Sequence, residues 1–188
     1  MQDELLVHDK IFIPYLSQAE IETGIKDLAA KINADYAGES PLFIAILNGS
    51  FMFASELFKH LTIASEICFI KLASYKGTTS SKHIITSIGL DTELKGKHVI
   101  ILEDILDTGK TLSQFLPQIE NMQPASLKIA ALLHKPDATI YNVPLDYNAF
   151  KIPNKFVVGF GLDYNGLGRN IPALYQEKIS ATTERFLV

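Results

Sequence analysis

The sequence is short of cysteine, of long apolar runs and of any leader-like opening, and each shortage excludes a class of protein. Its one cysteine, Cys68, makes no internal disulfide and no cysteine-based zinc site, and its apolar neighbours favour a buried structural thiol over a reactive one. The wholly apolar runs fall far short of the ~20 residues that span a membrane. The opening residues, MQDELLVHDK, have no basic segment followed by an apolar one. We therefore expect no signal peptide, no membrane contact and a reducing, cytoplasmic setting.

A basic excess is also missing. Lysine and arginine number 17 against 21 aspartates and glutamates, so the net charge is −4, whereas proteins that bind nucleic acid usually carry a positive surplus. A small anionic ligand is compatible with this balance, because a few local cations and amides bind it. The five histidines form no set with metal-ligand spacing, and the 188 residues contain no internal repeat. This favours a single domain over residues 1–188.

Apolar patterns predict strands that alternate with helices. The strands are expected at 41–47, 65–75, 97–102, 126–135 and 155–162, and the helices within 16–38, at 50–61 and at 108–122. Ser17 and Glu20 form a capping box for the first helix, and Pro117 is expected to end or kink the third. The polar segment 76–87 is predicted to be a mobile loop. The alternation indicates an α/β fold with a mostly parallel sheet, in which ligands bind at the carboxyl ends of the strands.

Residues 99–112, VIILEDILDTGKTL, run from an apolar strand into three acids and a Gly-Lys-Thr triplet. A nucleotide-binding P-loop is excluded, because Asp104 stands where that loop needs its first glycine and would repel phosphate. Thr108 to Thr111 instead begin a helix directly after a strand. Backbone amides, the helix dipole and two hydroxyls favour a phosphate group there.

The acids of this stretch divide by position. Glu103 and Asp104 are adjacent at a strand end and point to opposite faces. One of them therefore suits sugar hydroxyls and the other a hydrated Mg²⁺ ion, which keeps several of its waters. Two alternatives stay open here: Glu103 and Asp104 are simple loop acids, or Asp107 merely caps the following helix.

The same stretch resembles the phosphoribosyl-pyrophosphate (PRPP) motif of the type I phosphoribosyltransferases, most closely in their hypoxanthine-guanine branch, which acts on 6-oxopurines. Four further segments follow that branch's order: FIAILNGSFMFASEL, FIKLASY, ALLHK and IPNKFVVGFGLDYNGLGR. The resemblance covers about residues 10–175. It implies a twisted, mostly parallel sheet flanked by helices, with a core at about 38–145 and a small hood from about 1–16 and 150–188.

The resemblance also implies roles for residues on the PRPP side. Glu103 and Asp104 resemble the pair near the ribose hydroxyls and Mg²⁺, and Asp107 resembles the general acid/base at purine N7. The 5′-phosphate loop matches Asp107, Thr108, Gly109, Lys110 and Thr111. The family's pyrophosphate loop corresponds to Leu47, Asn48 and Gly49, with a cis peptide before Asn48. The residue that contacts the pyrophosphate from elsewhere in the chain corresponds to Arg169. Many relatives have lysine in place of Asn48, so the help of that cation is lost here.

On the purine side, the resemblance implies Lys135 as donor to O6, Phe156 as the ring stacked on the base, and the Val157 backbone as the reader of its edge. Ile105 and Asp163 complete this set. Mg²⁺ is the implied cofactor, with Glu103, Asp104 and Asp163 around the metal and its waters. The loop that closes over the site begins at Ser74 and Tyr75. Considered alone, Lys135 and Arg169 would be solvated charges and Phe156 a packing residue.

The implied reaction belongs to purine salvage: 5-phosphoribosyl moves from PRPP to hypoxanthine, and also to guanine, releasing pyrophosphate and a nucleoside monophosphate. A xanthine- or guanine-preferring enzyme is one alternative. A PRPP-sensing regulator that binds nucleic acid is another, but the acidic chain carries no added basic module for it. Because relatives form dimers and tetramers, a homodimer or homotetramer is expected.

Overall fold

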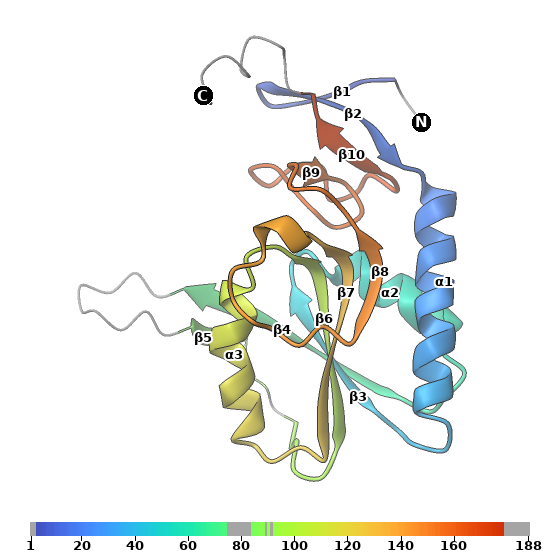
Figure 1. The fold of residues 1–188 in the computed structure, drawn as a ribbon, viewed down its shortest axis with the longest axis vertical. Helices are drawn as coiled ribbons and strands as arrows, with labels where there is room; N and C mark the ends of the chain where they lie inside the picture. Colours follow the sequence, from blue (N-terminus) through green and yellow to red (C-terminus); the bar gives the residue numbers. More distant parts are fainter. Residues whose placement is uncertain (1–2, 75–83, 89, 91, 179–188) are drawn as a thin grey trace, which may run out of the picture.

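The computed structural model describes residues 3–74, 84–88, 90 and 92–178, and their strands form two sheets (Figure 1). The larger sheet has the order β5-β4-β3-β6-β7-β8. Its strands are β3 (Leu42–Leu47), β4 (Glu66–Ser74), β5 (Ile84–Ile88), β6 (His98–Leu106), β7 (Ser126–His134) and β8 (Tyr147–Lys151). Neighbours from β4 to β8 are parallel, and β5 runs antiparallel to β4 at the edge. This confirms the predicted α/β class.

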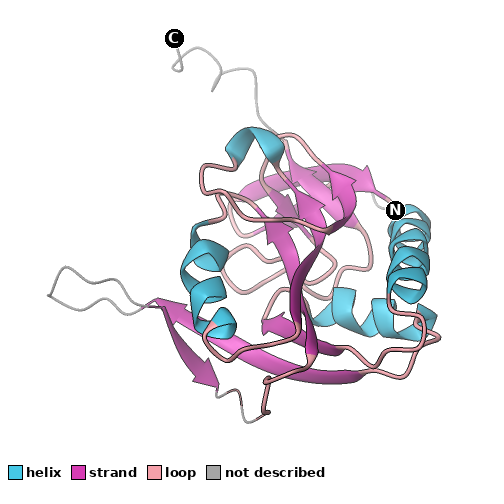
Figure 2. Cartoon of the chain, turned by 60° about the horizontal axis from the view of Figure 1, so that its bottom comes forward, coloured by secondary structure: helices cyan, strands magenta, loops and turns pink. Residues whose placement is uncertain are grey.

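Helices cover both faces of the larger sheet (Figure 2). They are α1 (Gln18–Asp35), α2 (Phe51–His60) and α3 (Lys110–Glu120), with a 3₁₀ turn, η1, at Pro136–Ala138. Successive side chains of β3 alternate between the faces: Phe43 packs in the cluster with α1 and α2, whereas Ile44 packs with α3. No helix in the described ranges combines the length and hydrophobicity that crossing a bilayer requires.

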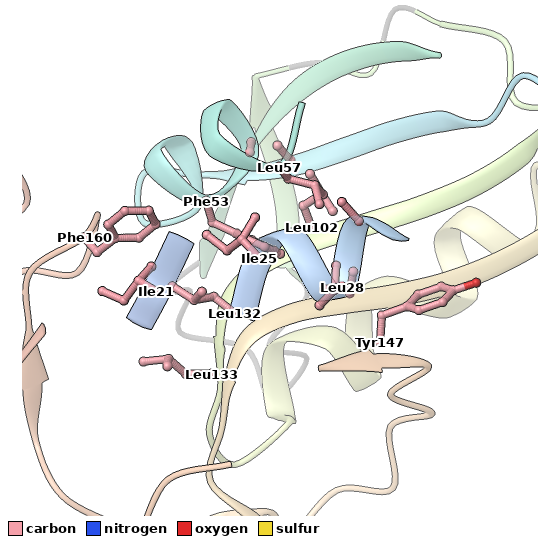
Figure 3. Packing of buried hydrophobic residues seen from close by; sticks show 14 of the residues in the cluster. Ile21, Ile25, Leu28, Phe53, Leu57, Leu102, Leu132, Leu133, Tyr147 and Phe160 are labelled. Carbon is pink, nitrogen blue, oxygen red and sulfur yellow. The ribbon is translucent and has the colours of Figure 1, made fainter. Parts of the chain in front are cut away.

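The cluster beneath α1 and α2 is the larger of the two cores. Figure 3 shows Ile25 and Leu28 of α1 gathered with Phe53 of α2. The first helix begins as predicted, because Ser17 and Glu20 form a capping box in which each side chain bonds the other's backbone N–H. On the other side of the sheet, Cys68 is half-buried, and this burial raises the pKa of its thiol, as expected of a structural cysteine.

The terminal segments build a smaller antiparallel sheet of order β1-β2-β10-β9 above the larger one (Figure 1). Its strands are β1 (Leu5–Val7), β2 (Lys10–Leu16), β9 (Val157–Val158) and β10 (Leu174–Glu177). Phe12, Val158 and Tyr175 pack in its own small core. This sheet is the hood that the resemblance implied; its division from the core at 1–16, 38–145 and 150–188 stays a prediction.

Three expected boundaries were wrong. Strand β6 continues through Leu106 rather than stopping at 102, because the segment with the acids keeps pairing with β7, Glu103 opposite Ala131 and Leu106 opposite His134. Helix α3 begins at Lys110 rather than at 108, and it runs past Pro117 to end at Glu120 rather than at 122. Pro117 lies on the exposed side of that helix, where water can satisfy the carbonyl that loses its partner.

Two further segments differ from expectation. Of the strand expected at 155–162, only Val157–Val158 is a strand, because Gly159, Phe160 and Gly161 all adopt positive φ and turn the chain. Of the loop expected at 76–87, residues 84–87 belong to β5, whose β-branched run IITSI suits a strand. The rest of that expected loop, with Tyr75 before it, lies outside the described residues.

Candidate active site

The predicted site residues lie where neighbouring strands end. The carboxyl ends of β3, β6 and β7 are adjacent, because these strands pair in parallel. The segment 47–49 lies at the end of β3, the acids of 103–107 lie in the last residues of β6 and just after it, and Lys135 directly follows β7. Residues that are far apart in the sequence therefore meet at one edge of the sheet. The hood supplies the remaining candidates: Phe156, Val157, Asp163 and Arg169.

The expected phosphate loop connects β6 to α3. Gly109, with φ of +80°, is the N-cap of α3, so the alternative that Asp107 caps this helix is wrong. The Thr108 carbonyl accepts hydrogen bonds from the backbone of Ile140 at 3.1 Å and of Tyr141 at 3.0 Å. A small recess of about 70 Å³ opens here, lined by Glu103 and the residues 105–112. Amides at a helix start suit an anion there.

A larger cleft, of about 210 Å³, adjoins this recess. It is lined by Asp104, Ile105, Asp107, Lys135, Phe156, Val157, Leu162 and Asp163. All five residues predicted to contact the purine are thus brought together, and Leu162 is one that the sequence reasoning missed. Phe156 keeps 39% of its surface exposed. This exposure fits a ring that stacks on a flat ligand better than it fits a core residue.

Lys135 and Asp107 form an ion pair inside this cleft. Lys135 is only 6% exposed, and its Nζ lies 3.2 Å from Asp107 Oδ2. A buried ammonium needs such a partner, since burying an unpaired charge is costly. The alternative of a solvated lysine is therefore wrong for Lys135.

The two adjacent acids face different hollows, as predicted from their strand positions. Glu103 lines the small recess and Asp104 the larger cleft. Burial and the neighbouring Asp104 charge raise the pKa of Glu103 well above its usual range, and Glu103 Oε2 is enclosed with no hydrogen-bond partner among the described residues. Burial likewise raises the pKa of Asp104 to about 6, although the Ile105 amide, donating to Oδ1 at 2.8 Å, opposes the shift. Neither acid is a simple loop acid.

The segment 47–49 approaches Asp104 closely. The peptide between Leu47 and Asn48 is cis, which confirms what the resemblance implied. A Cβ atom added at Gly49 would lie 1.4 Å from Asp104 Oδ2, so a larger residue there would displace the Asp104 carboxylate or the loop. From the hood, Gly161 approaches the same loop: its added Cβ would lie 2.0 Å from the Gly49 carbonyl.

Arg169 is anchored beside this contact. Its Nη2 lies 2.5 Å from Asp163 Oδ1, and its Nη1 donates to the Gly161 carbonyl at 2.7 Å. Asp163 also accepts from the Gly166 amide at 2.7 Å. Burial dominates the raised pKa of Asp104, and the Arg169 charge is among the effects that oppose this rise, so the guanidinium is within electrostatic reach of Asp104. Arg169 is thus a fixed cation of the site rather than a plain loop charge.

A direct metal cage is absent from the part of the chain that the structure describes, which contains no group of three or more His, Cys, Asp or Glu side chains suited to one metal ion. Ser74 is the last residue of β4. Sequence reasoning also missed Thr139 and Tyr141, which contact the phosphate loop from the turn after β7. No local motif marks them, because their contacts are made across about 30 residues of sequence.

Comparison with known proteins shows the family to which this chain belongs. The phosphoribosyl transferase domain family matches residues 15–165. The hypoxanthine-guanine phosphoribosyltransferase of Streptococcus pneumoniae is 42% identical over 158 residues, 84% of this chain and 88% of that protein. The one from Streptococcus agalactiae is 43% identical over 157 residues, 83% of this chain and 87% of that protein.

Solved structures show the same similarity. A hypoxanthine-guanine phosphoribosyltransferase from Bacillus anthracis, with HEPES in its active site, has a TM-score of 0.82 at 33% identity, covering 88% of this chain and 98% of that one. The chain therefore belongs to the phosphoribosyl transferase family. Within that family, its place is among the hypoxanthine-guanine phosphoribosyltransferases.

Proposed function

We propose that this protein transfers the 5-phosphoribosyl group of PRPP to hypoxanthine, and also to guanine, releasing pyrophosphate and IMP or GMP. One observation carries the proposal: a recess suited to a phosphate and a cleft suited to a flat base adjoin each other and share Ile105 and Asp107. A nucleoside monophosphate presents the same two groups, joined by a ribose. The likeness to the hypoxanthine-guanine phosphoribosyltransferases supports it.

Recognition of the base rests on Lys135 and Phe156. The Lys135 ammonium has three N–H donors, and its ion pair with Asp107 leaves it able to donate to purine O6. The half-exposed Phe156 ring stacks on the base, and the Val157 backbone reads its edge. Adenine has an amino group where hypoxanthine and guanine have O6, so it offers Lys135 no acceptor there.

In the reaction, purine N9 attacks C1′ of PRPP and the bond from C1′ to the pyrophosphate oxygen breaks. Asp107 takes the N7 proton of the attacking base, a contribution of about 10²–10⁴-fold for a well-placed group. Arg169 and the amides of 47–49 stabilise the charge that develops on the leaving pyrophosphate. The loop 107–111 fixes the 5′-phosphate and thereby the position of C1′.

Mg²⁺ is the cofactor that we propose, with Glu103, Asp104 and Asp163 around the metal and its waters. The donor set fits, because Glu103 Oε2 is buried with no hydrogen-bond partner in the described part of the chain. Both buried acids also have raised pKa values, a shift that a nearby cation would relieve. Bound Mg²⁺ neutralises pyrophosphate charge and keeps several waters, so few direct carboxylate ligands are needed.

Several parts of the proposal rest on the resemblance alone. These are the closing loop that begins at Ser74 and Tyr75, which would exclude water from PRPP, the homodimeric or homotetrameric assembly, and the cytoplasmic location. The remaining contacts proposed for Ile105, Thr108, Lys110 and Thr111 follow from the hollows that these residues line.

Steady-state assays with PRPP and Mg²⁺ test the function directly, with hypoxanthine, guanine, xanthine and adenine offered in turn. We expect turnover with hypoxanthine and guanine, none with adenine, and loss of activity when EDTA removes the metal. A preference for xanthine would correct the base assignment. An absence of turnover with every purine would refute the proposed enzymatic function.

A further inference from the structure

The hydroxyl of Thr139 joins the ends of two strands. Thr139 directly follows the turn η1 and is partly buried. Its Oγ1 lies 2.8 Å from the carbonyl oxygen of Asp107, at the end of β6, and 2.9 Å from that of Lys135, at the end of β7. A single hydroxyl therefore contacts the backbones of the two residues whose side chains form the ion pair in the base cleft.

His134 holds this hydroxyl from a third side. Its Nε2 lies 3.2 Å from Thr139 Oγ1. Because both carbonyls can only accept, the Thr139 proton is directed at them and the histidine ring N–H donates to Oγ1. Burial and the charge of Lys151 lower the pKa of His134, which favours the neutral ring at neutral pH. The result is a chain of hydrogen bonds from His134 through Thr139 to Asp107 and Lys135.

The phosphate loop is anchored separately. The backbone amides of Ile140 and Tyr141 donate to the Thr108 carbonyl, and neither bond needs the Thr139 side chain. The turn itself also has its own backbone bonds, from Ala138 to the Lys135 carbonyl at 3.1 Å and from Thr139 to the Pro136 carbonyl at 3.3 Å. Loss of the hydroxyl therefore leaves the backbone bonds of the turn and the Thr108 anchor of the phosphate loop intact.

We propose that Thr139 is a positioning residue for purine recognition, whose hydroxyl sets the spacing of Asp107 and Lys135 in the base cleft. This inference rests on the proposed function. Asp107 manages the N7 proton and Lys135 reads O6, so both must meet one rigid ring at once. The distance between N7 and O6 is fixed by the base, and a shift of either strand end spoils one of the two contacts.

Kinetics of Thr139→Val and Thr139→Ser test the proposal. Valine keeps the shape and removes the hydroxyl, whereas serine keeps the hydroxyl. We expect Thr139→Val to raise the KM for hypoxanthine about tenfold and to lower kcat, since misplacement of catalytic groups is costly, while the KM for PRPP changes less than about twofold. Thr139→Ser should restore purine KM to within about twofold of the wild type.

Thr23→Val is the matched control. Its hydroxyl also donates to a backbone carbonyl, that of Ala19 at 2.8 Å, but it lies on the exposed side of α1. This variant should keep all wild-type kinetic constants. Thermal unfolding of every variant shows whether it is folded, and a purely structural role of Thr139 would lower Tm without separating the two KM values.

Three outcomes would overturn the inference: an unchanged KM for hypoxanthine in Thr139→Val, equal changes in both KM values, or a Thr139→Ser variant as impaired as the valine. Each of these leaves the proposed function standing, because the wild type still turns over. A wild type inactive with every purine would instead refute the proposed function, and this inference with it.

Discussion

Asp107 stands between the two hollows of the site. Asp107 lines both the small recess next to the proposed phosphate loop and the larger cleft that we propose for the base, and its carboxylate accepts from Lys135 Nζ at 3.2 Å. Helix capping does not account for its place at the strand end, because Gly109 is the N-cap of α3. The position fits a group that manages a proton of the base while the adjoining loop holds a phosphate.

Replacement of Asp107 by asparagine tests this role. We expect Asp107→Asn to lower kcat by about 10²-fold or more, because the amide cannot take the N7 proton, and to leave the KM for PRPP within about threefold. The measurement is a steady-state kinetic comparison in both substrates. Asp137→Asn, an exposed acid in the neighbouring turn η1, is the matched control and should behave like the wild type. An unchanged kcat would remove Asp107 from acid/base chemistry.

At the scale of elements, the site depends on two close contacts of the segment 47–49, one with the Asp104 side chain of β6 and one with the backbone of the hood. The segment 47–49 lies against Asp104 of β6, and the hood reaches the same segment at Gly161. Gly161 has a φ of +98°, a conformation that favours glycine. The contact links the core sheet to the hood, so the position of the segment 47–49 depends on both.

We therefore expect Gly49→Ala to damage the site. Its Cβ would lie 1.4 Å from Asp104 Oδ2, so the Asp104 carboxylate, the loop or β6 must shift, at a typical overpacking cost of about 2 kcal/mol and a fall in Tm of about 5 °C. Turnover should fall more than tenfold, as the proposed pyrophosphate loop moves. Gly38→Ala is the control: it meets no atom within 4 Å and suffers only the strain of its φ of +86°, so its KM values should stay unchanged. Wild-type Tm and kcat in Gly49→Ala would contradict the packing argument.

At the scale of the whole molecule, the buried acids couple the site to stability. Burial raises the pKa of Asp104 from 3.8 to about 6 and that of Glu103 in the same direction. The folded protein therefore holds these protons more tightly than the unfolded chain does. Their contribution to stability is fully present below about pH 4 and is lost as the pH rises through about 6. The lowered pKa values of the exposed Asp9 and Glu20 act in the opposite direction.

The difference in the free energy of unfolding between the wild type and Asp104→Asn isolates this effect. In metal-free buffer, we expect the wild type to lose stability relative to the variant as pH rises from about 4 to 7, because asparagine cannot ionise. Thermal or urea unfolding across this range measures the difference. Asp27→Asn, an exposed acid on α1, serves as the control and should run parallel to the wild type. Parallel curves for Asp104→Asn and the wild type would mean that Asp104 is not held protonated by the fold.

The sequence by itself determined the fold class and supplied the candidate site residues, whose roles stay predictions. Alternating apolar strands and helices predicted the parallel sheet, and Ser17 with Glu20 marked the start of α1, because these signals act over a few residues. The stretch 99–112 located the acids and the phosphate loop for the same reason. Its missing glycine at Asp104 also excluded the P-loop correctly.

Tertiary structure decided what depends on distant partners. Glu103 to Leu106 belong to β6 because β7 pairs with them, and the hood's β9 is short because glycines at 159 and 161 turn the chain. The ion pair of Lys135 with Asp107, and the Thr139 hydroxyl between their backbones, join segments about 30 residues apart. Local propensity carries no information about such contacts, because their free energy arises only when packing brings the strand ends together.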